Sequence, residues 1–472
     1  MKDILKSVFN HFETLTTIPR GSQNREGIRA YLCAFARKHA LAYRTDSADN
    51  VIILKPAAGS STAPAVILQG HTDMVCACAE GYDIDFYHEP LRLRQKDGYL
   101  YAEGTSLGGD DGIAVAMMLA LLESDLELPA LECIFTADEE IGMVGATALD
   151  MSDMRGKYLI NIDSDEEGVI TVSCAGGSTA ALTLPTAWQE EDARLYDITV
   201  SGLKGGHSGT EIHLGGLNAN KVLGEVLQAL GAPRIAHIGG GEKENAIAVS
   251  AHARVAPAHE TDLEALLLRL EAEYKQTEPN IKITSAYQGL CTQKIMTAAA
   301  SAQVIQTLCA VPNGVMQMSA YDTSAVQTSL NLGVLEQTED TVVFTFSVRS
   351  SVSAEREALE ERLRAIAQAH GGTLRVSGVY PAWSYNPHSV LRDTAVQVFE
   401  KQYGYAPELQ SIHAGLECGV LAAKKADLEC ISIGPQMYDI HTARERLEIA
   451  SVQRTCTYLI SLIKALAAQP NL

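Results

Sequence analysis

Residues 107–135, LGGDDGIAVAMMLALLESDLELPALECIF, contain the pattern that decides the fold. The apolar run at 112–122 is long enough for a buried helix, and the short run at 131–135 is typical of a buried strand. Similar short runs stand at 51–54, 65–68 and 158–162. Strands that alternate with helices predict an α/β domain whose functional groups gather beyond the carboxyl ends of its strands.

The middle of the chain has a different pattern. Strands are predicted at 192–200 and 249–255 with a helix at 216–230 between them, and this order repeats at 341–348, 353–370 and 373–379. The α/β pattern then resumes with a helix at 389–403 and a strand at 428–433. The sequence therefore predicts an α/β domain made of residues 1–185 and 387–472, interrupted by an inserted α+β domain at residues 186–386.

Composition and charge restrict the partners. The 472 residues are 46% hydrophobic and 20% charged, a globular balance. With 37 basic and 58 acidic residues the net charge is −21, which makes nucleic acid and anionic membrane poor partners. The ten cysteines contain no C-x-x-C pair, no apolar run approaches the roughly 18 residues of a membrane span, and the amino terminus predicts a surface helix rather than a signal peptide. These features favour a cytoplasmic protein.

Histidines and carboxylates follow several of the predicted strands, and two adjacent acids precede the helix at 112–122. Each has an ordinary explanation by itself: a turn histidine, a helix cap by Asp111, or a solvated acidic turn. Together they predict a metal centre at one rim of the sheet, because imidazole and carboxylate suit zinc and a carboxylate can bridge two ions about 3.5–4 Å apart. The residues are His71, Asp73, Asp110, Glu139, Glu140, Asp163 and His441.

In its order and spacing this set resembles the co-catalytic dizinc exopeptidase family of carboxypeptidases, aminoacylases and dipeptidases. The stretches NIDSDEEG at 161–168, CAGG at 174–177, FSVRSS at 346–351 and IHAGLECG at 412–419 are similar to its aminoacyl-histidine dipeptidase (Xaa-His dipeptidase, carnosinase-like) branch. The resemblance covers essentially the whole chain. It implies a catalytic α/β domain, an inserted lid domain, and a homodimer joined through that lid.

The resemblance also implies two Zn²⁺ ions per subunit, for which Mn²⁺ or Co²⁺ can substitute. One ion would take His71, Asp163 and the bridging Asp110, and the other would take Glu140, His441 and the same Asp110. Glu139 would be the general base, and Asp73 would fix the tautomer of His71. The family often has Asn after the bridging Asp, where this chain has Asp111.

Four further residues receive roles by the same resemblance. His207, in the glycine-rich stretch at 204–209, would stabilise the tetrahedral intermediate in its own or a partner subunit. Asn245 and Arg349 would hold the substrate's free carboxylate, and Glu417 would meet its amino group. An exposed turn histidine, a surface ion pair of Arg349 and a plain loop acid at 417 are the alternatives.

These implications predict a cytosolic dizinc metallopeptidase that hydrolyses dipeptides, β-alanyl-histidine included, by a metal-bound hydroxide with Glu139 as general base. Two alternatives stay open. One is an amidohydrolase of the same family that acts on N-acyl amino acids. The other is a non-catalytic metal-binding protein that kept the fold.

Overall fold

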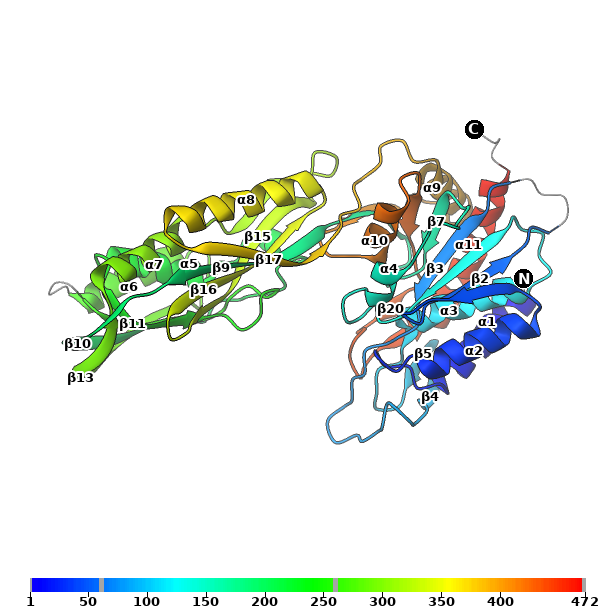
Figure 1. Cartoon of the computed structure of the whole chain (residues 1–472). Helices are drawn as coiled ribbons and strands as arrows, with labels where there is room; N and C mark the ends of the chain where they lie inside the picture. The colour runs from blue at the N-terminus through cyan, green and yellow to red at the C-terminus, as the bar shows by residue number, and fades with distance from the viewer. Residues whose placement is uncertain (1, 59–62, 258–261, 469–472) are drawn as a thin grey trace. The chain divides into compact units, whose positions relative to one another are not determined.

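The computed structural model describes residues 2–58, 63–257 and 262–468. It divides the chain into two compact units (Figure 1): unit 1 comprises Met1–Cys174, Tyr385–Ser411 and Leu416–Leu472, and unit 2 comprises Ala175–Ser384 and Ile412–Gly415. The chain passes into unit 2 after Cys174, whereas the expected boundary after residue 185 lies at the end of strand β9 (Gly176–Pro185). This strand belongs to unit 2 because it pairs along its whole length with β16 (Thr341–Ser350).

Unit 1 is built on an eight-stranded sheet in the order β1-β2-β6-β3-β7-β19-β8-β18. Four neighbouring strands run parallel, so their carboxyl ends meet at one edge of the sheet. Every residue of β3 and β6 is buried, as expected for parallel strands covered on both faces. The strands are β1 (Ala42–Thr45), β2 (Val51–Lys55), β3 (Val66–His71), β6 (Leu131–Thr136), β7 (Tyr158–Asn161), β8 (Val169–Cys174), β18 (Glu408–Ile412) and β19 (Glu429–Ser432).

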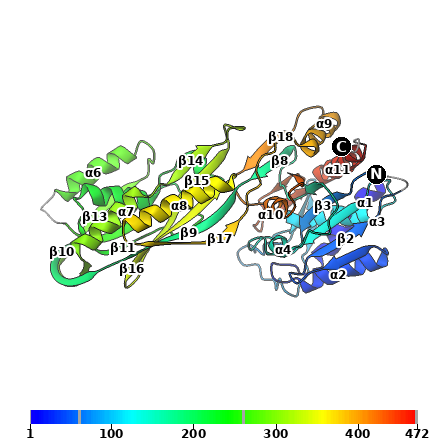
Figure 2. The same ribbon diagram turned by 45° about the horizontal axis from the view of Figure 1, so that its top comes forward.

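Helices cover this sheet and share one apolar core with it. Helix α3 packs on β3 and on α1, and α9 packs on α11, as Figures 1 and 2 show. The α/β pattern expected from residues 107–135 is confirmed by α3 and β6. The helices are α1 (Lys2–Thr16), α2 (Glu26–Lys38), α3 (Gly109–Glu123), α4 (Val144–Ala148), α9 (Val390–Tyr403), α10 (Glu417–Lys424) and α11 (Ile449–Ala467).

A small second sheet in unit 1 has the order β20-β21-β5-β4. It joins β20 (Met437–Tyr438) and β21 (Arg446–Glu448) to β5 (Tyr99–Ala102), which pairs with β4 (Leu93–Lys96). The loop at 439–445 between β20 and β21 carries His441. This sheet therefore holds the His441 loop beside the chain segment that leads into α3.

Unit 2 is an antiparallel sheet in the order β13-β10-β12-β11-β15-β16-β9-β17, with β14 paired to β15. The helices described in unit 2 lie on one face (Figure 1) and build a separate apolar core with the sheet, so the expected α+β insertion is confirmed. In the three described stretches no helix is both long and apolar enough to cross a membrane. The elements are β10 (Trp188–Ser201), η1 (Ile212–Leu214), α5 (Ala219–Ala229), β11 (Arg234–Gly240), β12 (Ala251–Ala256), α6 (Leu263–Tyr274), β13 (Lys282–Met296), α7 (Ala298–Ala310), β14 (Gly314–Met318), β15 (Val326–Gln337), α8 (Ser353–Ala369) and β17 (Thr373–Tyr380).

Candidate metal centre and active site

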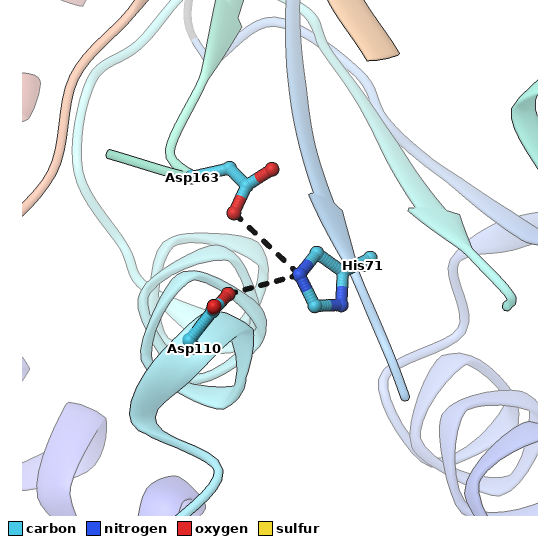
Figure 3. A group of neighbouring side chains, drawn as sticks. All are labelled: His71, Asp110 and Asp163. Atoms are coloured by element: carbon cyan, nitrogen blue, oxygen red, sulfur yellow. Dashed lines mark hydrogen bonds and ion pairs between the residues drawn. The ribbon is translucent and has the colours of Figure 1, made fainter. Parts of the chain in front are cut away.

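Five side chains from separate segments of unit 1 meet at the carboxyl edge of the parallel strands. Figure 3 shows Nε2 of His71, at the end of β3, pointing at the carboxylates of Asp110 and Asp163, 3.0 and 3.5 Å away. Nε2 of His441 lies 3.1 Å from the other oxygen of Asp110 and 3.0 Å from Oε1 of Glu140. Asp110 thus presents one oxygen to each histidine.

These residues form two groups of potential metal ligands that share Asp110. Within each group the ligand atoms all lie within 4.8 Å of one another. One imidazole and two carboxylates per group is a donor set that zinc and related divalent ions accept, and a carboxylate with one oxygen in each group is placed to bridge. The residues therefore fit two metal ions, and they are the residues that the sequence predicts as ligands: His71, Asp110 and Asp163 in one group, and Asp110, Glu140 and His441 in the other.

The charges in this cluster favour bound cations. Burial lowers the pKa of His71, but the carboxylates of Asp163, Asp110 and Asp73 outweigh this effect and raise it well above the usual value. Hydrogen bonds to Asp110 and Glu140 raise the pKa of His441 to about 10. A metal ion must displace protons from both imidazoles, so we expect metal binding to weaken as the pH falls.

Asp73 connects the His71 loop to the turn that carries Glu139. Its Oδ1 accepts the backbone N–H of Glu139 at 2.9 Å, and its Oδ2 accepts that of Glu140 at 3.3 Å. Nδ1 of His71 lies 3.2 Å from the main-chain oxygen of Asp73 and 3.5 Å from Oδ1. Asp73 is thus placed to orient both a ligand and the candidate base.

Glu139 lies beside the ligand atoms of His71 and Glu140. Burial, helped by the carboxylates of Asp163 and Glu417, raises the pKa of Glu139 to about 9. A carboxyl group with this pKa holds its proton at neutral pH, so Glu139 could act as a base only when nearby bound cations lower that pKa.

Glu417 is fully buried at the first residue of α10, and so it is not an exposed loop acid. Its Oε2 accepts hydrogen bonds from Oγ1 of Thr136 at 2.8 Å and from Nε2 of Gln69. Burial raises the pKa of Glu417 to about 7. Its Oε1 is also buried and finds no hydrogen-bond partner in the described part of the chain, so this oxygen is available to a ligand.

Asp111 does not cap α3, because its Oδ2 accepts the backbone N–H of His71 at 3.1 Å and the N-cap residue is Gly108. The adjacent Gly70 has no room for a side chain, since an added Cβ would lie 2.4 Å from Oδ2 of Asp111. Burial, together with Asp163, raises the pKa of Asp111 well above its usual value. The neutral acid that this favours resembles the Asn that the family often has at this position.

The remaining expected site residues lie in unit 2. Nδ1 of His207 accepts the backbone N–H groups of Gly209 and Thr210 at 3.3 and 3.2 Å, so the ring proton belongs on Nε2. Burial and the charge of Arg349 lower the pKa of His207, which keeps the ring neutral. Asn245 is exposed on the neighbouring loop, where its main-chain oxygen accepts the N–H of Ser208 at 2.8 Å.

Arg349 is only 8% exposed, so the alternative of a surface ion pair is wrong. Its Nη1 donates to the hydroxyl of Tyr380 at 3.0 Å. Within the described ranges, Nε is buried without a hydrogen-bond partner and no carboxylate forms an ion pair with the side chain. A buried guanidinium with unused donors is a site for a carboxylate ligand.

His413 is a candidate residue that sequence reasoning missed, although it lies in the quoted stretch 412–419. Its Nε2 lies 2.7 Å from Oγ of Ser329. Its Nδ1 is buried and has no partner among the residues described. Burial and the nearby Arg349 lower the pKa of His413 to about 3. His413 thus lies near Arg349 and His207, two other nitrogen-bearing side chains of unit 2.

The lowered pKa of His413 predicts that unit 2 is less stable in acid. The histidine of the unfolded chain takes a proton below a pKa of roughly 6.5, but the folded one does not until about pH 3, so stability present above pH 6.5 is lost as the pH falls. Between pH 7 and pH 5 the loss is about 2 kcal/mol, at ~1.4 kcal/mol per pH unit. Arg349, His207 and His213 are the charged or titratable groups that face His413.

Denaturant unfolding followed by tryptophan fluorescence measures this effect, because Trp188 and Trp383 both lie in unit 2. Between pH 7 and pH 5, we expect the free energy of unfolding of the His413→Gln variant to fall by about 2 kcal/mol less than that of the wild type. The exposed His252 of unit 2, which is not among the groups that face His413, is changed to Gln as the control and keeps the wild-type slope. Equal slopes in wild type and His413→Gln would contradict the assignment.

Known proteins resemble the chain over nearly its whole length. The family profile described as "Peptidase family M20/M25/M40" matches residues 67–465. The chain is 32% identical over 472 residues to the cytosol non-specific dipeptidase of Escherichia coli (strain K12), with 97% of each chain covered. The crystal structure of aminoacylhistidine dipeptidase from Vibrio alginolyticus matches with a TM-score of 0.90 and 32% identity, covering 97% of this chain and 96% of that one. Aminopeptidase PepT from Bacillus cereus ATCC 10987, at 18% identity, a TM-score of 0.57 and coverage of 98% and 99%, shares the fold.

Proposed function

Because this chain belongs to peptidase family M20/M25/M40, we propose that it is a dizinc dipeptidase that hydrolyses dipeptides, with Xaa-His dipeptides and β-alanyl-histidine among its substrates. The observation that carries the proposal is the placement of Asp110 between two histidine and carboxylate groups, with Glu139 beside them. The dipeptidase names of the two relatives at 32% identity support the substrate class. Zinc is the proposed ion, and Mn²⁺ or Co²⁺ accept the same ligands.

The residues around the metal centre receive the following roles. Two bound ions would polarise the carbonyl group of the peptide bond that is cleaved and would lower the pKa of a water molecule. Glu139 accepts a proton from the attacking water and passes it to the leaving amine. Asp73 holds the turn of Glu139 through the backbone N–H and keeps His71 oriented.

The ends of the substrate are bound by groups with unused hydrogen-bonding capacity. We assign the substrate's carboxylate to Arg349, assisted by Asn245, and its amino group to Glu417. The unpaired Nε of Arg349 and Oε1 of Glu417 in the described chain support these roles. The Nε2–H of His207 is the proposed donor to the oxyanion, in its own or a partner subunit, because Nδ1 is already an acceptor.

Removing Arg349 is expected to weaken binding of the substrate's carboxylate. For Arg349→Ala we expect the KM for dipeptides to rise by about 10–100-fold, because hydrogen bonds between charged groups contribute ~1.5–3 kcal/mol. A dipeptide amide, which lacks the carboxylate, should be cleaved equally by both proteins. Steady-state kinetics on each dipeptide and its amide measure the difference. The exposed Arg375 on β17, changed to Ala, serves as the control, and equal losses on dipeptide and amide would count against the role.

The proposed reaction is tested by assaying the zinc-loaded protein on Xaa-His dipeptides, other dipeptides, a tripeptide and an N-acetyl amino acid. We expect hydrolysis of dipeptides only, abolished by a chelator and restored by Zn²⁺. Turnover of the N-acetyl amino acid alone would establish the amidohydrolase alternative. No turnover of any compound by protein with two bound ions would favour the non-catalytic alternative.

Two further expectations concern the setting of the protein. We propose that it acts in the cytoplasm, which is supported by the name of the E. coli relative. We also propose a homodimer joined through the inserted domain, as the family resemblance implies. Light scattering at micromolar concentration tests the dimer, and a mass of one chain would contradict it.

A further inference from the structure

Unit 1 contains a cavity of about 490 Å³ beside the metal-ligand cluster. Its walls come from residues 21, 22, 24, 74–76, 84–87 and 140–141. The ligand candidate Glu140 itself lines the cavity, and Met74 follows directly on the loop of His71 and Asp73. The cavity therefore adjoins the candidate metal centre at Glu140, and its volume lies in the range of small-molecule sites, ~300–1,000 Å³.

Polar side chains of the cavity wall already have partners. Oγ of Ser22 donates to Asp73 at 2.8 Å, and Nδ2 of Asn24 donates to the main-chain oxygen of Tyr87 at 3.2 Å. Asp85 accepts the N–H of Tyr87 at 2.9 Å and lies 2.7 Å from Nδ1 of His88. Each of these polar side chains therefore has at least one hydrogen-bond partner within the protein.

The wall also exposes apolar side chains. Tyr87 is 61% and Ile141 is 46% exposed, although both side chains are large and apolar. A ligand that covered them would remove apolar area from water. The two charged residues of the wall, Asp85 and Glu140, are both acidic, so an acidic ligand would be repelled. The apolar wall residues are Met74, Val75, Ile84, Phe86, Tyr87 and Ile141.

We propose that this cavity binds the side chain of the substrate's amino-terminal residue and selects uncharged apolar side chains such as those of Leu, Met and Phe. This inference rests on the proposed function. The carbonyl group of the cleaved peptide bond belongs to the amino-terminal residue. The side chain of that residue branches from the carbon next to the reacting carbonyl carbon. The side chain of the other residue is one bond farther away. The cavity shares Glu140 with the metal-ligand cluster and is thus placed for the nearer side chain.

The metal-loaded protein is assayed on Leu-Gly, Glu-Gly, Gly-Gly and Gly-Leu. We expect kcat/KM for Leu-Gly to exceed that for Gly-Gly by about 10–100-fold, the value of burying a leucine side chain, and Glu-Gly to be poorer than Gly-Gly. Phe86→Ala should lower kcat/KM for Leu-Gly about fivefold or more and leave Gly-Gly within about twofold. Ile84→Lys should raise the kcat/KM for Glu-Gly relative to the kcat/KM for Leu-Gly. Tyr43→Ala, which removes a partly exposed aromatic ring of unit 1 outside the cavity, should match the wild type.

Several outcomes would overturn the assignment. One is that Phe86→Ala changes the kcat/KM for Leu-Gly and Gly-Gly equally, and another is that it changes neither. A third is that the preference follows the carboxy-terminal leucine of Gly-Leu. A second measurement does not depend on turnover: L-leucine, but not glycine or L-glutamate, should raise the melting temperature of the wild type and not of Phe86→Ala. If no dipeptide is cleaved but leucine still protects, the proposed function fails and the cavity assignment stands. If dipeptides are cleaved without this selectivity and leucine gives no protection, the cavity assignment fails alone.

Discussion

Replacing Glu139 with Gln is expected to lower kcat by about 10²–10⁴-fold, the usual contribution of a general base. The amide has nearly the same shape as the carboxylate but cannot accept the proton of the attacking water. The backbone N–H of residue 139 would still be held by Asp73, since that bond, 2.9 Å long, does not involve the side chain. We therefore expect the variant to fold and to bind two metal ions.

The measurement combines turnover on a dipeptide with metal content after gel filtration. Two other glutamates, each changed to Gln, serve as comparisons. Glu140→Gln removes a ligand candidate, and so it should lose metal as well as activity. The exposed Glu166, changed to Gln, should lose neither. A Glu139→Gln protein with two bound ions and wild-type turnover would rule out the proposed base.

Part of the metal centre was predictable because one geometric rule places several of its residues. Parallel strands end at one edge of a sheet, and here His71 pairs in register with Thr136 while Gln69 pairs with Asn161. Acids that follow β6 and β7 must then lie near a histidine at the end of β3. The family expected from these residues is the one to which the chain belongs. The ligand roles themselves stay predictions until metal binding is measured.

His441 reaches the same cluster by a different route from the one expected. The sequence suggested that it follows the apolar strand at 428–433, but β19 ends at Ser432 and a separate two-residue strand, β20, comes before His441. Its position depends on pairing between β21 and β5, which are more than three hundred residues apart in the chain. Short strands with distant partners leave almost no signal in local sequence.

The residues that were missed share this dependence on distant partners. Arg20 is buried, and its guanidinium donates to the main-chain oxygens of Thr72 at 3.0 Å, Asp73 at 3.1 Å and Gly108. The single arginine after Pro19 gives no hint of these contacts in sequence. His413 was likewise visible only as part of a resembling stretch. The position of a carboxylate or imidazole at a strand end can be predicted from that strand alone. Arg20 and His413 instead contact segments that are distant in sequence and come near only in the folded chain.

Glu445 is the strongest case of such a connection, and its removal is expected to have the largest effect on the stability of unit 1. Its Oε2 accepts the N–H groups of Leu107 and Gly108 at 2.8 and 3.0 Å, and its Oε1 accepts those of Gly109 and Asp110 at 2.8 and 3.3 Å. It lies in the same loop as His441, between β20 and β21. One buried carboxylate thus fixes the loop of the bridging Asp110 to the loop of His441.

We expect Glu445→Ala to lower the free energy of unfolding of the metal-free protein by about 3–5 kcal/mol, because it leaves four backbone N–H groups without their acceptor. Metal affinity should fall by about 10–100-fold, as it does when a group that orients ligands is lost. Circular dichroism in denaturant measures the first effect, and competition with a chromophoric chelator measures the second.

Two matched variants separate orientation of the ligands from general damage. Glu445→Gln keeps the shape and one acceptor oxygen but turns an NH₂ group toward two of the donors, so we expect its stability and metal affinity to fall between those of the wild type and Glu445→Ala. Glu448→Ala removes a carboxylate three residues away that pairs with Arg454, and a partly exposed pair of this kind contributes at most about 1 kcal/mol. If both Glu445 variants bound metal within about twofold of the wild type while losing stability, Glu445 would support the fold without orienting the ligands. Weaker metal binding in step with the number of lost acceptors would instead show that the position of Asp110 relative to His441 is set by this one side chain.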